Sequence, residues 1–215
     1  MRPKLVLWGA SGHALTVADI VSLCGEYELT GFIEDSAYEE SPGEFCGLPL
    51  FMGRLHLDRL YHDGVRFVIM AFGNCRARLD LALFAQEKGF HLAKAVHPSA
   101  VIAKGVRIGE GTVIAAGAVV NPAATIGNNV IINTSASVDH EVLIADGVHI
   151  CPGVRLAGRV RVEEAAWIGV GSSVVDRVTI GAGAFIGAGS VVVDDIPPFS
   201  LAYGVPAKVI KRIEP

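Results

Sequence analysis

An aliphatic residue recurs at every sixth position through the second half of this 215-residue chain. The series runs from Val96 to Val192, and its seventeen members are all Val, Ile or Leu. The position four residues after each member, from Ile102 on, is nearly always small or β-branched. A helix repeats about every 3.6 residues and a strand about every two, so neither explains a sustained period of six. Hexapeptide repeats are instead a signature of the parallel β-helix.

In such a β-helix, each aliphatic residue points into a narrow triangular prism, and a small residue fits near each corner. Three hexapeptides complete one coil, so residues about 18 apart stack on one another. The aliphatic series continues without a gap, which predicts a β-helix over residues 96–196. It also explains the mean hydropathy of +0.47, because the repeat core is continuously apolar.

Residues 1–94 follow a different pattern, in which short apolar strands alternate with amphipathic helices. The order strand, helix, strand predicts a small, Rossmann-like parallel α/β domain, followed by the β-helix domain at 95–215. The expected strands are LVLW (5–8), ELTGFIED (28–35) and VRFVIMAFGN (65–74), and the expected helices are HALTVADIVSL (13–23) and RARLDLALFAQEKG (76–89).

Composition excludes several classes of function. No apolar run approaches the roughly 20 residues that a membrane-spanning helix needs, so we expect no membrane partner. The net charge of −4 argues against a nucleic-acid partner, because phosphate neutralisation requires clustered Lys and Arg. The four cysteines form no CxxC pair or regular framework, which is typical of reduced thiols in a cytoplasmic protein.

Four further segments indicate which group of repeat proteins the chain resembles: GASGHA (9–14), AFGNCRAR (71–78), HPSA (97–100) and GVPAKVIK (204–211). Together with the repeat they resemble the left-handed β-helix acyltransferases of the hexapeptide family. Within that family, the resemblance is to sialic-acid O-acetyltransferases and nucleotide-amino-sugar N-acetyltransferases. It implies acetyl-CoA as co-substrate, a homotrimer, and active sites in the clefts between prisms.

Two histidines, His140 and His149, interrupt the apolar repeat, and neither occupies an inward aliphatic position. Both should therefore project outward or lie at a corner. A histidine beside a carboxylate can be held in one tautomer and act as a general base. By resemblance, His140 matches the catalytic base and Glu141 its acidic partner. Adjacent residues of a strand point to opposite sides, so Glu141 can assist only within a turn, and Asp139 is the alternative.

The resemblance also assigns cofactor and acceptor residues in the β-helix. His149 matches a residue that contacts acetyl-CoA. The backbones of Val170 and Ala188, which stack 18 residues apart, match the pantetheine site. Asn133 matches a position near the acceptor, although an asparagine at a corner turn is an equal alternative.

The segment GASGHA lies between a strand and a helix, but it is not a complete G-x-G-x-x-G motif, so it supports NAD binding only weakly. Its glycines allow a tight turn, and the helix N-terminus offers N–H groups to a phosphate; a turn needed for packing alone is the alternative. By resemblance, Ser11, Gly12, His13 and Asp35 bind a nucleotide-activated amino sugar. Arg78 either meets a phosphate or is a solvated helix charge.

Some β-helix proteins are zinc enzymes with three converging histidines. The third histidine of the repeat, His97, lies more than two coils from His140, so we expect no metal. The function that the resemblance implies, and our leading hypothesis, is an acetyl-CoA-dependent N-acetyltransferase for the 4-amino group of a UDP- or GDP-linked 4-amino-4,6-dideoxy sugar, in bacterial glycan biosynthesis. The alternatives are a sialic-acid or related sugar O-acetyltransferase and a sugar-sensing scaffold without activity.

Overall fold

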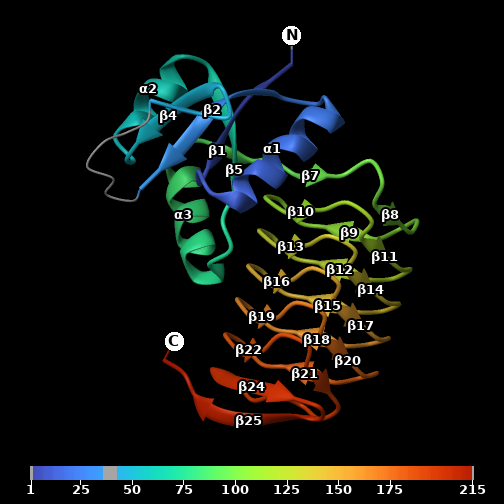
Figure 1. Cartoon of the computed structure of the whole chain (residues 1–215). Coiled ribbons are helices and arrows are strands. Elements are labelled where there is room, and N and C mark those ends of the chain that lie inside the picture. Colours follow the sequence, from blue (N-terminus) through green and yellow to red (C-terminus); the bar gives the residue numbers. More distant parts are fainter. Residues whose placement is uncertain (1, 36–42, 215) are drawn as a thin grey trace. The chain divides into compact units, whose positions relative to one another are not determined.

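The computed structural model describes residues 2–35 and 43–214. The chain forms two compact units, Met1–Pro98 and Ser99–Pro215 (Figure 1). In the described residues, no helix is both long and apolar enough to cross a membrane.

The first unit is built on one sheet with the strand order β3-β4-β2-β1-β5-β6. Its strands pair in parallel except β3, which forms an antiparallel hairpin with β4. The predicted parallel α/β domain is therefore confirmed. The elements are β1 (Lys4–Trp8), α1 (Gly12–Cys24), β2 (Glu28–Glu34), β3 (Glu44–Phe45), β4 (Leu48–Met52), α2 (His56–His62), β5 (Val65–Met70), α3 (Cys75–Glu87), β6 (His91–Leu92) and β7 (Ala95–Val96).

The ends of the two longer helices follow from local chemistry. The side chain of Asn74 accepts a hydrogen bond from the Ala77 N–H at 3.0 Å and so caps the start of α3. At the end of α1, Gly25 adopts the left-handed conformation with φ 65°, and its N–H donates to the Val21 carbonyl. The central strand β1 is buried from Leu5 to Trp8, as expected for a parallel strand covered on both faces.

The second unit consists of two-residue strands separated by turns, and each strand pairs in parallel with the strand three positions along the chain. These strands are β8 (Val101–Ile102), β9 (Arg107–Ile108), β10 (Val113–Ile114), β11 (Val119–Val120), β12 (Thr125–Ile126), β13 (Ile131–Ile132), β14 (Ser137–Val138), β15 (Leu143–Ile144), β16 (His149–Ile150), β17 (Arg155–Leu156), β18 (Arg161–Val162), β19 (Trp167–Ile168), β20 (Ser173–Val174), β21 (Thr179–Ile180), β22 (Phe185–Ile186) and β23 (Val191–Val192).

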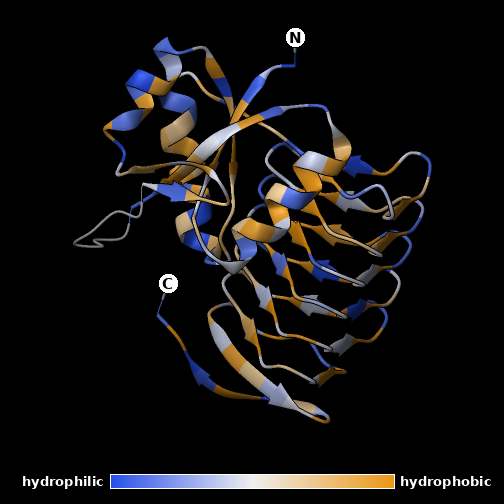
Figure 2. Cartoon of the chain, turned by 45° about the horizontal axis from the view of Figure 1, so that its top comes forward, coloured by the Kyte–Doolittle hydropathy of each residue, from blue (hydrophilic) through white to orange (hydrophobic). Residues whose placement is uncertain are grey.

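The register matches the sequence period. Ile126 pairs with Ile144, and Ile144 pairs with Val162, so residues 18 apart stack in one ladder. From Ile114 to Val192, every member of the aliphatic series is buried, whereas Ile102 and Ile108 in the first coil are half-buried. Hydrophobic segments recur in successive coils (Figure 2). The expected left-handed parallel β-helix is confirmed.

A two-stranded hairpin ends the coil. The strand β24 (Ser200–Gly204) pairs in parallel with β22, and β25 (Ala207–Arg212) turns back antiparallel to β24. The hairpin thus extends the sheet that contains β10, β13, β16, β19 and β22, and covers the hydrogen-bonding edge of its last coil strand.

Candidate active site

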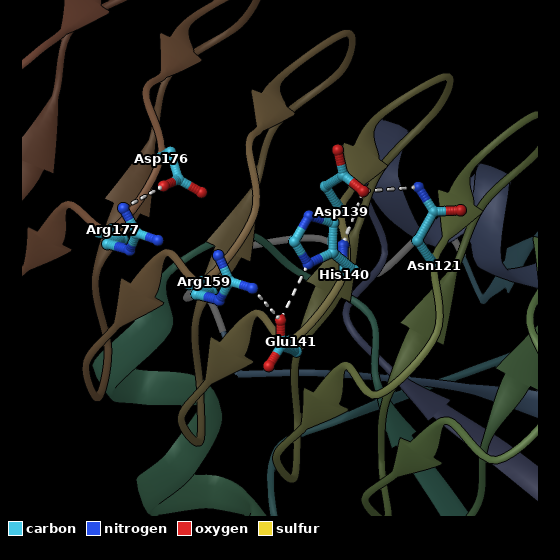
Figure 3. Close-up of polar contacts among 7 residues, drawn as sticks. All are labelled: Asn121, Asp139, His140, Glu141, Arg159, Asp176 and Arg177. Atoms are coloured by element: carbon cyan, nitrogen blue, oxygen red, sulfur yellow. Dashed lines mark hydrogen bonds and ion pairs between the residues drawn. The ribbon is translucent and has the colours of Figure 1, made fainter.

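His140 and Glu141 form the corner turn between β14 and β15 (Figure 3). Glu141 has φ 58°, in the left-handed region, so the two residues do not alternate as they would in a strand. The imidazole Nδ1 lies 3.1 Å from Oε2 of Glu141. The turn that Glu141 needs in order to reach the ring is therefore present.

The Glu141 carboxylate also forms an ion pair with Arg159. Nη2 of Arg159 lies 2.9 Å from the same Oε2 atom. The hydrogen bond from His140, followed by the charge of Arg159, holds the pKa of the Glu141 carboxyl below its usual range. An ionised carboxylate accepts a hydrogen bond from a protonated Nδ1. The lone pair of the neutral imidazole then lies on Nε2. This is the tautomer that a general base requires.

Asp139, the alternative partner, contacts the backbone instead of the ring. Its Oδ1 accepts the backbone N–H of His140 at 2.7 Å and the side-chain amide of Asn121 at 3.0 Å. Asp139 therefore fixes the start of the turn, and Glu141 contacts the imidazole.

His149 lies on the outer side of β16, yet it is only 5% exposed. Its Nε2 lies 3.3 Å from Nδ2 of Asn133, and its ring centroid lies 4.3 Å from that of Trp167. The Asn133 Oδ1 accepts the Thr134 N–H at 2.8 Å, so this side chain serves both the corner turn and the histidine. The structure thus brings together a residue expected at the acceptor and one expected at acetyl-CoA.

The stack of Pro152, Val170 and Ala188 is formed as expected from the 18-residue spacing. The Gly171 N–H donates to the Pro152 carbonyl at 2.9 Å, and the Gly189 N–H donates to the Val170 carbonyl at 2.8 Å. Val170 and Ala188 are both exposed. Within residues 2–35 and 43–214, neither of their amide N–H groups donates a hydrogen bond to another part of the chain.

In the first unit, the segment after β1 makes a tight turn into α1. Gly9 has φ 123°, and a Cβ there would lie 2.8 Å from the Ala71 carbonyl oxygen, so only glycine fits. Ser11 occupies the N-cap of α1 without a capping hydrogen bond from its side chain. A Cβ on Gly12, the first residue of α1, would meet no atom within 4 Å.

The His13 ring lies behind this helix terminus, with its Nε2 atom buried. Burial, together with the nearby positive charge of Arg78, lowers the pKa of His13 to about 4. The imidazole is therefore neutral at physiological pH.

Asp35, expected as the last residue of the strand, follows directly after β2, which ends at Glu34. Its carboxylate accepts a hydrogen bond from Nε of Arg54 at 2.9 Å. Its neighbour Glu34 contacts the glycine turn, because Oε2 of Glu34 accepts the Ala10 N–H at 3.1 Å. The sequence analysis did not identify Glu34. The sequence signal that could have identified it is that two acidic residues, Glu34 and Asp35, stand together at the carboxyl end of β2.

Arg78 is not a solvated helix charge, because it is fully buried. Its Nη1 donates to the Gly73 carbonyl at 2.9 Å and to the Phe72 carbonyl at 3.3 Å, and burial lowers the pKa of its guanidinium. It supports the turn that precedes α3. Among the described residues, no group of three or more His, Cys, Asp and Glu side chains is arranged to hold a metal ion.

Two protein-family models match the chain. Residues 4–83 match the PglD N-terminal domain, and residues 159–194 match the bacterial transferase hexapeptide model of six repeats. No curated protein matches the chain.

Solved structures match almost the whole chain. PerB from Caulobacter crescentus, in complex with CoA and GDP-perosamine, is 39% identical with a TM-score of 0.91, and the match covers 97% of each chain. The acetyltransferase domain of PglB from Neisseria gonorrhoeae, in complex with acetyl coenzyme A, is 34% identical with a TM-score of 0.89, covering 98% of this chain and 100% of that one. WeeI from Acinetobacter baumannii, 24% identical with a TM-score of 0.85, shares the fold over 96% of this chain and 99% of its own.

Proposed function

Because this chain belongs to the hexapeptide-repeat acetyltransferases that act on sugars with acetyl-CoA, we propose that it acetylates the 4-amino group of a nucleotide-linked 4-amino-4,6-dideoxy sugar. A GDP-linked sugar is the first choice, since PerB was solved with GDP-perosamine. The reaction would serve bacterial glycan biosynthesis. The observation that carries the proposal is the His140–Glu141 pair, whose geometry leaves a proton acceptor at an exposed corner.

In the proposed reaction, the amino nitrogen of the sugar attacks the carbonyl carbon of the acetyl thioester. A C–N bond forms as the C–S bond breaks. Nε2 of His140 accepts the proton that the nitrogen loses and returns it to the departing sulfur, so the products are an amide and free CoA. Ionised Glu141 holds the ring and stabilises the imidazolium that forms between the two proton transfers.

The co-substrate would lie along the exposed stack of Val170 and Ala188. Their undonated amide N–H groups fit the carbonyl oxygens of a pantetheine arm. His149 and Asn133 would complete this region, since Nδ2 of Asn133 lies 3.3 Å from Nε2 of His149.

The nucleotide would bind in the first unit. Ser11 and Gly12 begin α1, and the open space at Gly12 lets a phosphate approach the N–H groups of the helix terminus. His13 is neutral and can orient a polar group of the ligand. Asp35, at the carboxyl end of β2, is placed as an acid that meets a ribose or base.

We further propose a homotrimer. His140–Glu141 and Asn133–His149 form separate clusters, because the first lies in the turn between β14 and β15, whereas Asn133 follows β13 and His149 lies on β16. A site that uses both would combine one cluster from each of two chains. Multi-angle light scattering should give about three times 22.6 kDa, and a fully active monomer would refute the shared site.

The four cysteines are free thiols, which supports a cytoplasmic location. The test of function is acetylation of GDP-perosamine, of a UDP-linked 4-amino sugar and of free sialic acid, each with acetyl-CoA and followed by mass spectrometry. We expect an alkali-stable amide on an amino-sugar nucleotide. An alkali-labile ester on sialic acid, with no amino-sugar product, would replace this function by O-acetylation.

A further inference from the structure

The corner that carries His140 and Glu141 continues as a column through the next two coils. Gly158 and Arg159 occupy the equivalent turn positions one coil later, and Asp176 and Arg177 follow. The backbones are joined, because the Arg159 N–H donates to the His140 carbonyl at 2.9 Å and the Arg177 N–H donates to the Gly158 carbonyl at 3.0 Å.

Gly158 lies directly beneath the imidazole. A Cβ at this residue would lie 2.6 Å from both Cε1 and Nε2 of His140, well inside the closest separation that two such atoms tolerate. It would also lie 3.0 Å from Oδ1 of Asp176, whose half-exposed side chain has room to shift. Gly158 is not among the glycines with positive φ, so its backbone does not require glycine. The absence of a side chain at this buried residue instead leaves room for the ring.

Arg159 supports the same ring indirectly, through its ion pair with Glu141. Its backbone is left-handed with φ 60°, a conformation that is unfavourable for a non-glycine residue. Gly105 holds the same place three coils earlier and avoids this cost. The contact that its side chain makes separates Arg159 from Arg177, whose backbone is equally left-handed. The Arg159 guanidinium lies 2.9 Å from Oε2 of Glu141, whereas Arg177 pairs with Asp176.

We propose that Gly158 and Arg159 are positioning residues for His140. Gly158 provides the space in which the Cε1–Nε2 edge of the ring lies, and Arg159 fixes the carboxylate that holds Nδ1 (Figure 3). The inference rests on the proposed function of His140 as the base. The coil after the base, and not the base's own turn alone, then sets the direction of the proton-accepting lone pair.

The first test is Gly158→Ala, assayed with acetyl-CoA and GDP-perosamine. The new methyl group displaces the half-exposed imidazole, which is free to swing outward, so the melting temperature should change little. A misplacement of about 1 Å costs up to about 100-fold in rate, so kcat should fall roughly 10- to 100-fold with KM for acetyl-CoA unchanged.

The same substitution in a His140→Ala background separates positioning from general damage. With the imidazole gone, Gly158→Ala should cause no further loss of turnover or of melting temperature. An additional loss in that background would show that the methyl group damages the coil itself, and would overturn the role of Gly158. A wild-type kcat in the Gly158→Ala single variant would also overturn the role of Gly158.

Arg159 is tested by Arg159→Gln, which removes the charge on Glu141. We expect a several-fold fall in kcat that Arg159→Lys partly restores. Arg177→Gln is the matched control, because Arg177 has the same left-handed turn with φ 64° but pairs with Asp176 at 3.3 Å and not with Glu141. Equal losses in Arg159→Gln and Arg177→Gln would overturn the role of Arg159.

The outcomes also distinguish this inference from the proposed function. If His140→Ala abolishes turnover while Gly158→Ala and Arg159→Gln are fully active, the base stands and the positioning roles are wrong. If His140→Ala itself keeps turnover, the proposed base is wrong and the positioning roles fall with it.

Discussion

The imidazole Nδ1 of His140 lies 3.1 Å from Oε2 of Glu141, although the two residues are neighbours in the chain. In a strand their side chains would point to opposite faces. The contact exists because Glu141 adopts φ 58° at a corner of the prism, which turns both side chains to the same side. The β-helix therefore supplies at its corners a geometry that its flat faces do not allow.

The role of this contact is tested by Glu141→Gln. The neutral amide cannot stabilise an imidazolium by charge, so we expect kcat to fall about tenfold or more while KM for acetyl-CoA is maintained. The pKa of Glu141 is held below its usual range, so this carboxyl should remain ionised where ordinary glutamates begin to protonate. Asp139→Asn should lower kcat less, because Asp139 contacts the backbone. An equal or larger effect at Asp139 would reverse the assignment.

The inward register is tested by Ile144→Asp. Ile144 is 3% exposed, and an unpaired carboxylate buried in its place costs several kcal/mol. Soluble expression should be lost. Its neighbour Leu143, which points outward and is 38% exposed, is the control, and Leu143→Asp should remain soluble. Similar behaviour of both variants would contradict the alternation along β15.

His149 should contribute to acetyl-CoA binding and not to proton transfer. We expect His149→Ala to raise KM for acetyl-CoA several-fold, with a smaller change in turnover at saturation. The variant removes a ring that packs on Trp167 and meets Asn133, so its melting temperature must be measured alongside. A large loss of kcat at unchanged KM would instead place His149 at the chemical step.

His13 predicts how stability depends on pH. Its pKa is about 4 in the folded chain and about 6.5 when unfolded, so the unfolded state binds the proton more readily between these values. Stability should therefore fall as the pH drops from about 6.5 to 4, by about 1–3 kcal/mol. Urea unfolding at pH 7 and pH 5 measures this difference, and His13→Gln should reduce it. An unchanged pH dependence in His13→Gln would contradict the assignment.

Most of the fold could be predicted from the sequence, because each buried residue of the β-helix repeats the same local environment. Ile126, Ile144 and Val162 share one ladder, so the six-residue period alone was enough to predict the coils of the second unit. The elements that were missed lack such a period. The helix α2 has seven residues, β3 has two, and β25 is largely exposed.

The site was less predictable, because contacts between coils depend on side-chain directions that spacing does not give. The spacing of 18 places Gly158 next to His140, but it does not show that the ring lies where a Cβ on Gly158 would come within 2.6 Å of it. The sequence also gave no reason to expect His149 to be buried on an outer face, since burial there depends on the neighbouring Trp167 ring. Of the two alternatives for Arg78, a solvated helix charge was wrong, because the position of a residue in a helix does not report its burial.

The central claim is that His140 accepts the proton of a sugar amine during acetyl transfer. The direct measurement is the rate of CoA release, followed with a thiol reagent, for wild type and His140→Ala with acetyl-CoA and GDP-perosamine. We expect kcat to fall by roughly 10²–10⁴-fold while acetyl-CoA binding changes little, and wild-type activity to fall on acidification because a protonated imidazole accepts no proton. Near wild-type turnover of His140→Ala at neutral pH would contradict the account.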